Sequence, residues 1–226
     1  MKITYFGHST YQIEAAGVTL LVDPFIAENP HTEVDPDTLE PDVILVSHAH
    51  FDHIADAPDI ASRTGAEVIS NFEITQWFAN EHGHENNTVV NEGGKLRFDW
   101  GSVEAVHARH TSSFPDGSYG GVPNGHIIHI EDTCIYNAGD TAPFAEMEWI
   151  GEEHSVDLAA LPIGGVLTMG MSGAIKAADL VNADTILPVH YDTFPNIKVD
   201  LDDWEQRCDE AGFQTQTVPP GESFEL

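Results

Sequence analysis

Short apolar runs recur along the chain, and most are rich in β-branched residues and bounded by Pro, Gly or Asp. Such runs predict buried strands. In the first half, the expected strands span residues 3–6, 11–14, 18–22, 43–46, 67–70 and 88–91. In the second half, they span residues 95–99, 103–109, 127–130, 134–137, 158–161 and 185–189, with two short strands after the last helix.

Helical patterns follow the strands in each half. The expected helices span residues 54–63, 72–81, 143–153, 172–181 and 201–211, with Asn71 as a cap and Gly65 and Gly83 as stops. Strands therefore gather before helices twice along the chain. This order predicts one domain, residues 1–226, of the α/β (α+β) class, in which two facing sheets carry helices outside as a four-layer αββα sandwich.

One polar cluster stands directly after the predicted strand 43–46. His48, His50, Asp52 and His53 fall within six positions, where a strand ends and a helix begins. Binding sites of α/β folds lie at such carboxyl ends. A lone histidine is more often a satisfied or solvent-facing residue. Four hydrophilic side chains packed together cost free energy unless something pairs with all of them, and a divalent metal does so.

Further candidate ligands end other predicted strands: His110, Asp140 and His190. Strand alternation places His107 and His110 on opposite faces, so only one can point into the site, and His110 is favoured because it borders a loop. Non-metal interpretations stay open, since Asp140 could cap a helix before Pro143 and His190 could be a hydrogen-bonded core histidine.

The seven groups divide between two ions. One ion would take His48, His50 and His110, the other Asp52, His53 and His190, and Asp140 would bridge them. Each ion then keeps an open position, as a catalytic metal needs. Most remaining histidines have non-metal explanations near helix ends, on a strand or in an acidic loop: His31, His82, His84, His126, His129 and His154. His8 stays undecided, because its loop joins two strands at a sheet end.

Acidic residues far outnumber basic ones, with 38 Asp and Glu against 8 Lys and Arg, a net charge of −30. Such a surface repels phosphate backbones and disfavours nucleic acid and anionic membranes as partners. A competing explanation is a halophilic protein adapted to concentrated salt, in which case the charge says little about the substrate. Cys134 and Cys208 form no C-x-x-C pair, which suits a reducing compartment. Without a signal-peptide core or a ~20-residue apolar run, we expect a cytoplasmic protein.

The polar motifs together resemble the metallo-β-lactamase fold superfamily. The similarity rests on H-A-H-F-D-H at residues 48–53, His110, G-D-T at residues 139–141 and His190. A narrower resemblance is to a little-characterised branch of metal-dependent hydrolases related to L-ascorbate 6-phosphate lactonase. Its motifs lie at residues 7–9, 23–25, 110–113, 161–165 and 190–195.

The resemblance implies the αββα sandwich and the dinuclear centre. True β-lactamases use a cysteine in the second site, and neither Cys134 nor Cys208 is placed for that, so β-lactam hydrolysis is disfavoured. Nothing resembles the substrate-binding arm of tRNA-processing nucleases.

A metal-dependent hydrolase is therefore the predicted function, with a small-molecule ester, lactone or phosphoester as substrate. Two ions, Zn²⁺ with Mn²⁺ or Fe²⁺ as alternatives, would hold the attacking hydroxide. Asp52 would orient it, His8 and Tyr191 would hold substrate or protonate the leaving group, and Asp23 would position a ligand. The alternatives are a mononuclear iron oxidoreductase (dioxygenase-like) on the same fold and a purely structural metal site. A homo-oligomer is left open.

Salt adaptation predicts that the free energy of unfolding rises between low and molar KCl. The physical reason is that the Debye length falls to ~3 Å at 1 M, which screens repulsion within a chain of net charge −30. Denaturant unfolding at both KCl concentrations measures the change. A free energy that stays constant or falls would contradict salt adaptation.

Overall fold

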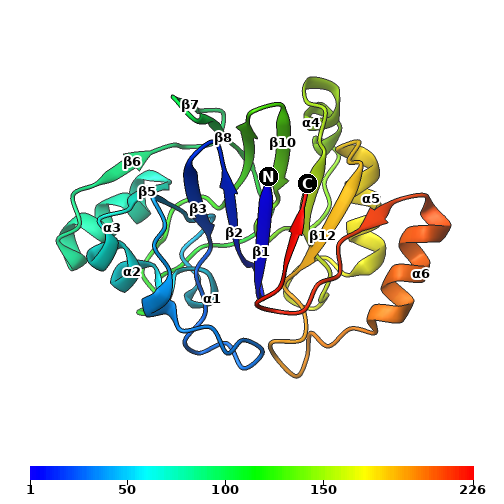
Figure 1. The fold of residues 1–226 in the computed structure, drawn as a ribbon, viewed down its shortest axis with the longest axis horizontal. Helices are drawn as coiled ribbons and strands as arrows, with labels where there is room; N and C mark the ends of the chain where they lie inside the picture. The colour runs from blue at the N-terminus through cyan, green and yellow to red at the C-terminus, as the bar shows by residue number, and fades with distance from the viewer.

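The computed structural model describes residues 1–226, which form two seven-stranded sheets with helices on their outer sides (Figure 1). The first sheet has the order β14-β1-β2-β3-β4-β5-β6. Its strands are β1 (Lys2–Gly7), β2 (Thr10–Ala15), β3 (Val18–Val22), β4 (Val43–Leu45), β5 (Glu67–Ser70), β6 (Asn87–Val89) and β14 (Ser223–Glu225). β1, β2 and β3 form an antiparallel meander, and β3 to β6 run parallel.

The second sheet repeats this arrangement in the order β13-β12-β11-β10-β9-β8-β7. Its strands are β7 (Lys95–Phe98), β8 (Gly101–His107), β9 (Asn124–Ile130), β10 (Thr133–Asn137), β11 (Leu158–Pro162), β12 (Thr185–Val189) and β13 (Gln214–Thr215). β7 to β10 are antiparallel, and β10 to β13 are parallel. The predicted four-layer α/β architecture is confirmed.

The helices flank the two sheets as outer layers (Figure 1). The first sheet carries the 3-10 turn η1 (Pro36–Thr38), α1 (Phe51–Ile54), α2 (Ala57–Thr64) and α3 (Phe72–His82); the second carries α4 (Met147–Glu153), α5 (Met171–Leu180) and α6 (Leu201–Ala211). The predicted caps are confirmed, since the Asn71 side chain accepts from the Ile74 amide and Gly65 and Gly83 end their helices in left-handed conformation. None of these helices is long and apolar enough to span a bilayer.

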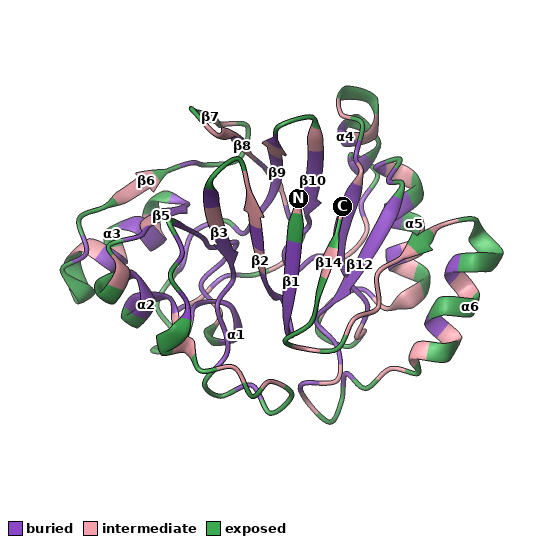
Figure 2. Cartoon of the chain, viewed as in Figure 1, coloured by how far each residue is buried: buried purple, intermediate pink, exposed green.

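Two hydrophobic cores hold the layers together. The larger contains 41 buried residues, and it fills the space between the sheets and beneath α4, α5 and α6. The smaller contains 16 buried residues under the helices of the first sheet. Figure 2 shows buried residues along both sheets and exposed residues on the outward helix faces and loops. Because the larger core takes side chains from both sheets, the two sheets pack as one unit.

Two predicted helices differ from the structure in their bounds. The helix expected over residues 54–63 is two helices, α1 and α2, because Pro58 cannot donate to the Ile54 carbonyl and the Asp56 carboxylate binds backbone amides at Ile26 and Ala27. The helix expected from Pro143 starts at Met147, since the Ala142 amide donates to the Arg109 carbonyl and holds the preceding segment outside the helix.

One predicted strand needs correction at its end. The strand expected over residues 103–109 ends at His107, so His110 lies in the loop beyond it. The two short strands predicted after the last helix are present as β13 and β14, and β14 crosses back to pair with β1 of the first sheet.

The strand ends that carry the predicted ligands meet where the two sheets touch. The His190 amide donates to the His8 carbonyl at 2.8 Å, and the Asn124 amide donates to the Ser47 carbonyl at 3.0 Å. Both bonds join one sheet to the other. The polar residues of both sheets consequently converge at one end of the sandwich.

Trp204→Ala tests the packing of α6 on the second sheet. Trp204 is fully buried, and its indole donates to the Thr215 hydroxyl at 2.9 Å. Its loss should lower the free energy of unfolding by about 3–5 kcal/mol in denaturant titrations. Trp149→Ala is the matched control, since Trp149 is 63% exposed and should change stability by less than about 1 kcal/mol. Equal effects of the two variants would contradict this packing.

Candidate metal centre

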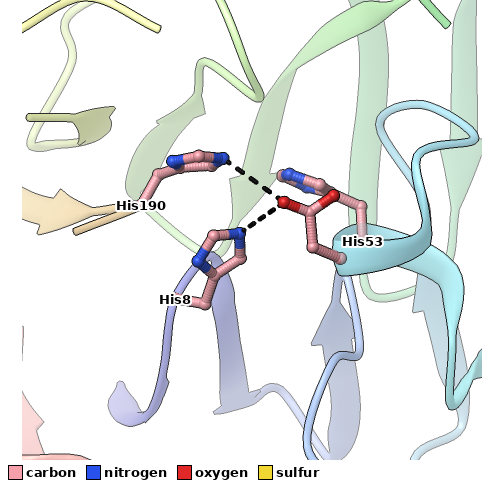
Figure 3. Close-up of side chains that lie close together, drawn as sticks. His8, His53 and His190 are labelled. Atoms are coloured by element: carbon pink, nitrogen blue, oxygen red, sulfur yellow. Dashed lines mark hydrogen bonds and ion pairs between the residues drawn. The ribbon is translucent and has the colours of Figure 1, made fainter. Parts of the chain in front are cut away.

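All seven ligands predicted from the sequence lie together at the junction of the sheets. Together with His8 they form two groups, and the ligand atoms within each group lie within 4.8 Å of one another. The first group is His48, His50, His110 and Asp140, and the second is His8, Asp52, His53 and His190. Figure 3 shows that the side chains of His8, His53 and His190 lie close together. Oδ2 of Asp52 lies 3.1 Å from His8 Nε2 and 3.7 Å from His190 Nε2.

The Asp140 carboxylate lies between the two groups. Its oxygens are 3.5 and 3.9 Å from the Nε2 atoms of His110 and His48 in the first group. They are 3.0 and 3.3 Å from the Nε2 atoms of His190 and His53 in the second group. A carboxylate with this reach can serve two ions at once.

Several buried polar atoms of the site have no hydrogen-bond partner. They are Nε2 of His53, both ring nitrogens of His190 and Oδ1 of Asp140. Unpaired buried polar atoms cost free energy, and native proteins leave few of them. These are nitrogen and oxygen donors aimed at a common space, so divalent metal ions fit the residues present.

The backbone is strained where it presents these side chains. His8, Asp23 and His190 have φ angles of 53°, 42° and 54°, in the left-handed region that non-glycine residues rarely adopt. Gly139, with φ of 59°, precedes Asp140, and a Cβ there would lie 3.0 Å from the Asn124 carbonyl oxygen. The chain thus turns sharply where it delivers His8, Asp140 and His190.

Asp23 orients two histidines of the site through the loop before α1. Its carboxylate accepts from the Ser47 amide at 2.7 Å, the Ser47 hydroxyl at 2.6 Å and His53 Nδ1 at 2.9 Å. With Nδ1 as donor, His53 keeps Nε2 free for a metal. The Ser47 hydroxyl also lies 2.9 Å from His48 Nδ1. Asp23 therefore occupies the supporting position expected of it, while the part of Ser47 was not predicted.

His8, whose role the sequence left undecided, lies in the second ligand group. It is buried, with Nδ1 2.9 Å from the Thr193 hydroxyl and Nε2 3.1 Å from Asp52 Oδ2. Burial and the neighbouring His190 lower its pKa to about 4, so the ring is neutral near pH 7. In one tautomer of the neutral ring, Nε2–H donates to Asp52. In the other, Nδ1–H donates to the Thr193 hydroxyl, and Nε2 is then free to bind a metal.

Tyr191 lies outside both ligand groups. Its ring stacks on Tyr5 with centroids 6.4 Å apart, and burial raises its pKa to about 12. With His8 it lines a cavity of about 340 Å³. An aromatic cluster that the sequence did not reveal, Phe25, Phe51 and Phe194, also borders the site, with Phe25 and Phe194 each 5.6 Å from the His8 ring.

Histidines assigned non-metal roles from the sequence have protein partners. His107 lies 3.2 Å from a Glu92 carboxylate oxygen, His84 pairs with the Ala66 carbonyl and His31 with the Asp192 carbonyl. His126 is fully buried beside Asn137, and burial lowers its pKa to about 4. His129 and His154 differ from this set, since they lie together with Cys134.

Asp23→Asn should weaken metal binding about 10- to 100-fold without unfolding the chain, because an amide cannot accept from both Ser47 and His53. Competition with a chromophoric chelator measures the affinity. Asp42→Asn is the matched control, since Asp42 accepts from the Thr19 amide at the exposed other end of the strands. Unchanged affinity in Asp23→Asn would contradict the orienting role.

Residues 2–190 match the family described as a beta-lactamase superfamily domain. A UPF0173 metal-dependent hydrolase of Salinibacter ruber is 54% identical over 226 residues and is matched over 100% of both chains. A second, from Methylacidiphilum infernorum, is 46% identical over 97% of this chain and 95% of its own.

Among solved structures, Igni18, a metallo hydrolase from the archaeon Ignicoccus hospitalis, superposes with a TM-score of 0.90. It is 36% identical in sequence, and the match covers 100% of this chain and 98% of that one. Sequence and fold agree over nearly the full length. The chain belongs to the beta-lactamase superfamily and, within it, to the UPF0173 metal-dependent hydrolases.

Proposed function

We propose that the chain is a dinuclear metal-dependent hydrolase acting on a small-molecule ester, lactone or phosphoester. The observation that carries this proposal is the Asp140 carboxylate, buried between two ligand groups and within 3.9 Å of histidines from both. A mononuclear site would need only one of the two groups.

One ion is assigned to His48, His50 and His110, the other to Asp52, His53 and His190, with Asp140 shared. His8 is either a further ligand of the second ion or the hydrogen-bond donor to Asp52. Two ions, when bound, supply a water activated for nucleophilic attack and a Lewis acid for the substrate oxygen. Imidazole and carboxylate ligands suit Zn²⁺, which is the proposed metal, and they also suit the alternatives Mn²⁺ and Fe²⁺, because neither group contains a thiolate that would select among the three.

Asp52 is the residue proposed to orient the attacking water. Although burial opposes ionisation, the hydrogen bond from His8 and the charge at His53 lower the Asp52 pKa. The carboxylate is thus an acceptor throughout the neutral range. His8 is assigned to holding Asp52 and the substrate and not to proton donation, because its ring is neutral near pH 7 and its Nε2 lies 3.1 Å from Asp52. Tyr191 stays a proposed substrate contact through the cavity that it shares with His8.

Substrate access is proposed on the side of His50 and His110, the two half-buried ligands, whereas His48, His53 and His190 are fully buried. Phe51, which is 41% exposed, stands at this side and contacts Phe25. An apolar portion of the substrate would pack on these rings.

Asp140→Ala should abolish binding of a pair of ions and lower turnover more than ~100-fold on a panel of lactones, phosphodiesters and thioesters. Metal analysis and the panel provide the two readouts. Asp116→Ala is the control, because Asp116 is an exposed loop carboxylate bonded to Ser118. A variant that kept two ions and full turnover would refute the bridging role. A content of one iron ion per chain, together with visible absorption of the purified protein, would instead favour the mononuclear oxidoreductase.

Metal binding near neutral pH should release a proton and weaken as pH falls. Burial opposes the charged ring, but the carboxylates of Asp140 and Asp23 raise the His53 pKa well above its usual value. In the metal-free site His53 therefore holds a proton that a metal ion must displace. Lowering the pH favours protonated His53 and thereby weakens metal binding. Calorimetric titration in buffers of different ionisation enthalpy counts the protons. Binding heats that do not depend on the buffer would contradict this prediction.

A further inference from the structure

A second cluster of metal-binding side chains lies on the outer face of the second sheet, away from the metal centre. It consists of His129 on β9, Cys134 on β10 and His154, the residue that ends α4. His129 and Cys134 are directly opposite each other in the antiparallel pair, so their side chains share one face. β9 begins at Asn124 beside the metal centre, and the five residues to His129 span roughly 16 Å.

The distances in this cluster match those around a tetrahedral zinc ion. His129 Nε2 lies 3.2 Å from His154 Nδ1 and 3.8 Å from Cys134 Sγ. Zinc bonds of ~2.05 Å to nitrogen and ~2.3 Å to sulfur put neighbouring ligand atoms about 3.3 Å apart for two nitrogens and about 3.6 Å apart for nitrogen and sulfur. The three side chains therefore need only small adjustments to hold one ion.

Carboxylates that could supply a fourth ligand lie beside His154 and Cys134. Glu104 and Glu153 form a group with His154 in which the ligand atoms lie within 4.8 Å. The Asp157 carboxylate accepts from the Cys134 amide at 2.7 Å. The cation beside them, Lys95, is paired with Glu104 at 2.9 Å. Since three carboxylates oppose one ammonium, the local field favours a divalent cation.

One member of the cluster, His154, is reached from a cavity. Glu104, Glu153 and His154 line this cavity of about 700 Å³, together with the exposed Trp149 of α4. His129 is half-buried and Cys134 is buried, and burial raises the thiol pKa of Cys134 to about 12. A metal entering by the cavity would meet His154 first.

We propose that His129, Cys134 and His154, with Glu104 or Glu153, form a separate zinc site that ties the β9–β10 hairpin to the end of α4. One sulfur, two nitrogens and a carboxylate complete a closed tetrahedral set, the arrangement of structural zinc. The site does not depend on the hydrolytic centre, whose two ligand groups contain no sulfur. This assignment replaces the non-metal roles expected for His129 and His154.

The test is titration of the metal-free full-length chain with Co²⁺. Cobalt takes the tetrahedral sites of zinc, and a thiolate-to-cobalt charge-transfer band arises only where a cysteine coordinates. Once cobalt has been added beyond the two ions of the hydrolytic centre, we expect a band from one cysteine-bound cobalt per chain, which Cys134→Ser should abolish and Cys208→Ser should keep. Cys208 is the matched control, because it is the other free cysteine and lies buried in α6 outside any ligand group.

The proposal is overturned if the folded chain gives no charge-transfer band or if the band survives in Cys134→Ser. Should Cys134→Ser lose its circular dichroism signature, His154→Ala carries the test, since His154 is half-buried at a helix end. That variant should bind cobalt at the sulfur site about 100-fold more weakly. An unchanged affinity there would equally overturn the site. Because the hydrolytic centre gives no sulfur band, its own failure would be seen separately in turnover.

Discussion

A carboxylate buried among imidazoles from two different sheets is the constraint around which this fold is arranged. Asp140 is 3% exposed, and the histidines within 3.9 Å of it come from both sheets. Such a charge is tolerated only if its partners are held in place. Gly139 gives the turn that delivers it, Asp23 fixes His53, and the His190–His8 backbone bond closes the two sheets around it. The larger core supplies the rigidity on which these contacts depend.

Much of this arrangement could be predicted because the chain marks strand ends clearly. Apolar β-branched runs followed directly by His or Asp locate the carboxyl ends of strands, where side chains from neighbouring strands converge. The choice of His110 over His107 agrees with the ligand group, but strand alternation does not explain it, because the strand ends at His107 and His110 lies in the loop beyond. The convergence of the seven predicted residues follows from their positions at or just after strand ends.

Contacts between distant segments could not be predicted. Nothing local indicates that Thr193 meets His8 across 185 positions, or that β14 returns to pair with β1. His129 and Cys134 lie opposite each other because of the register of the β9–β10 hairpin, and His154 lies beside them because α4 ends there. The pattern of a single sequence predicts where a helix or strand lies but not which elements pack beside it. The cluster of His129, Cys134 and His154 can therefore be recognised only from the structure.

The order of the ligands along the chain has a consequence for biosynthesis. The first group is complete once residue 140 has been made, whereas the second waits for residue 190, which is 190 − 140 = 50 residues later. At ~5–20 residues per second, translation separates the two by roughly 3–10 s. All residues of the first group are thus synthesised while β11 and β12 are still unmade. Under the dinuclear proposal, the ion assigned to His48, His50 and His110 would have the earlier opportunity to bind.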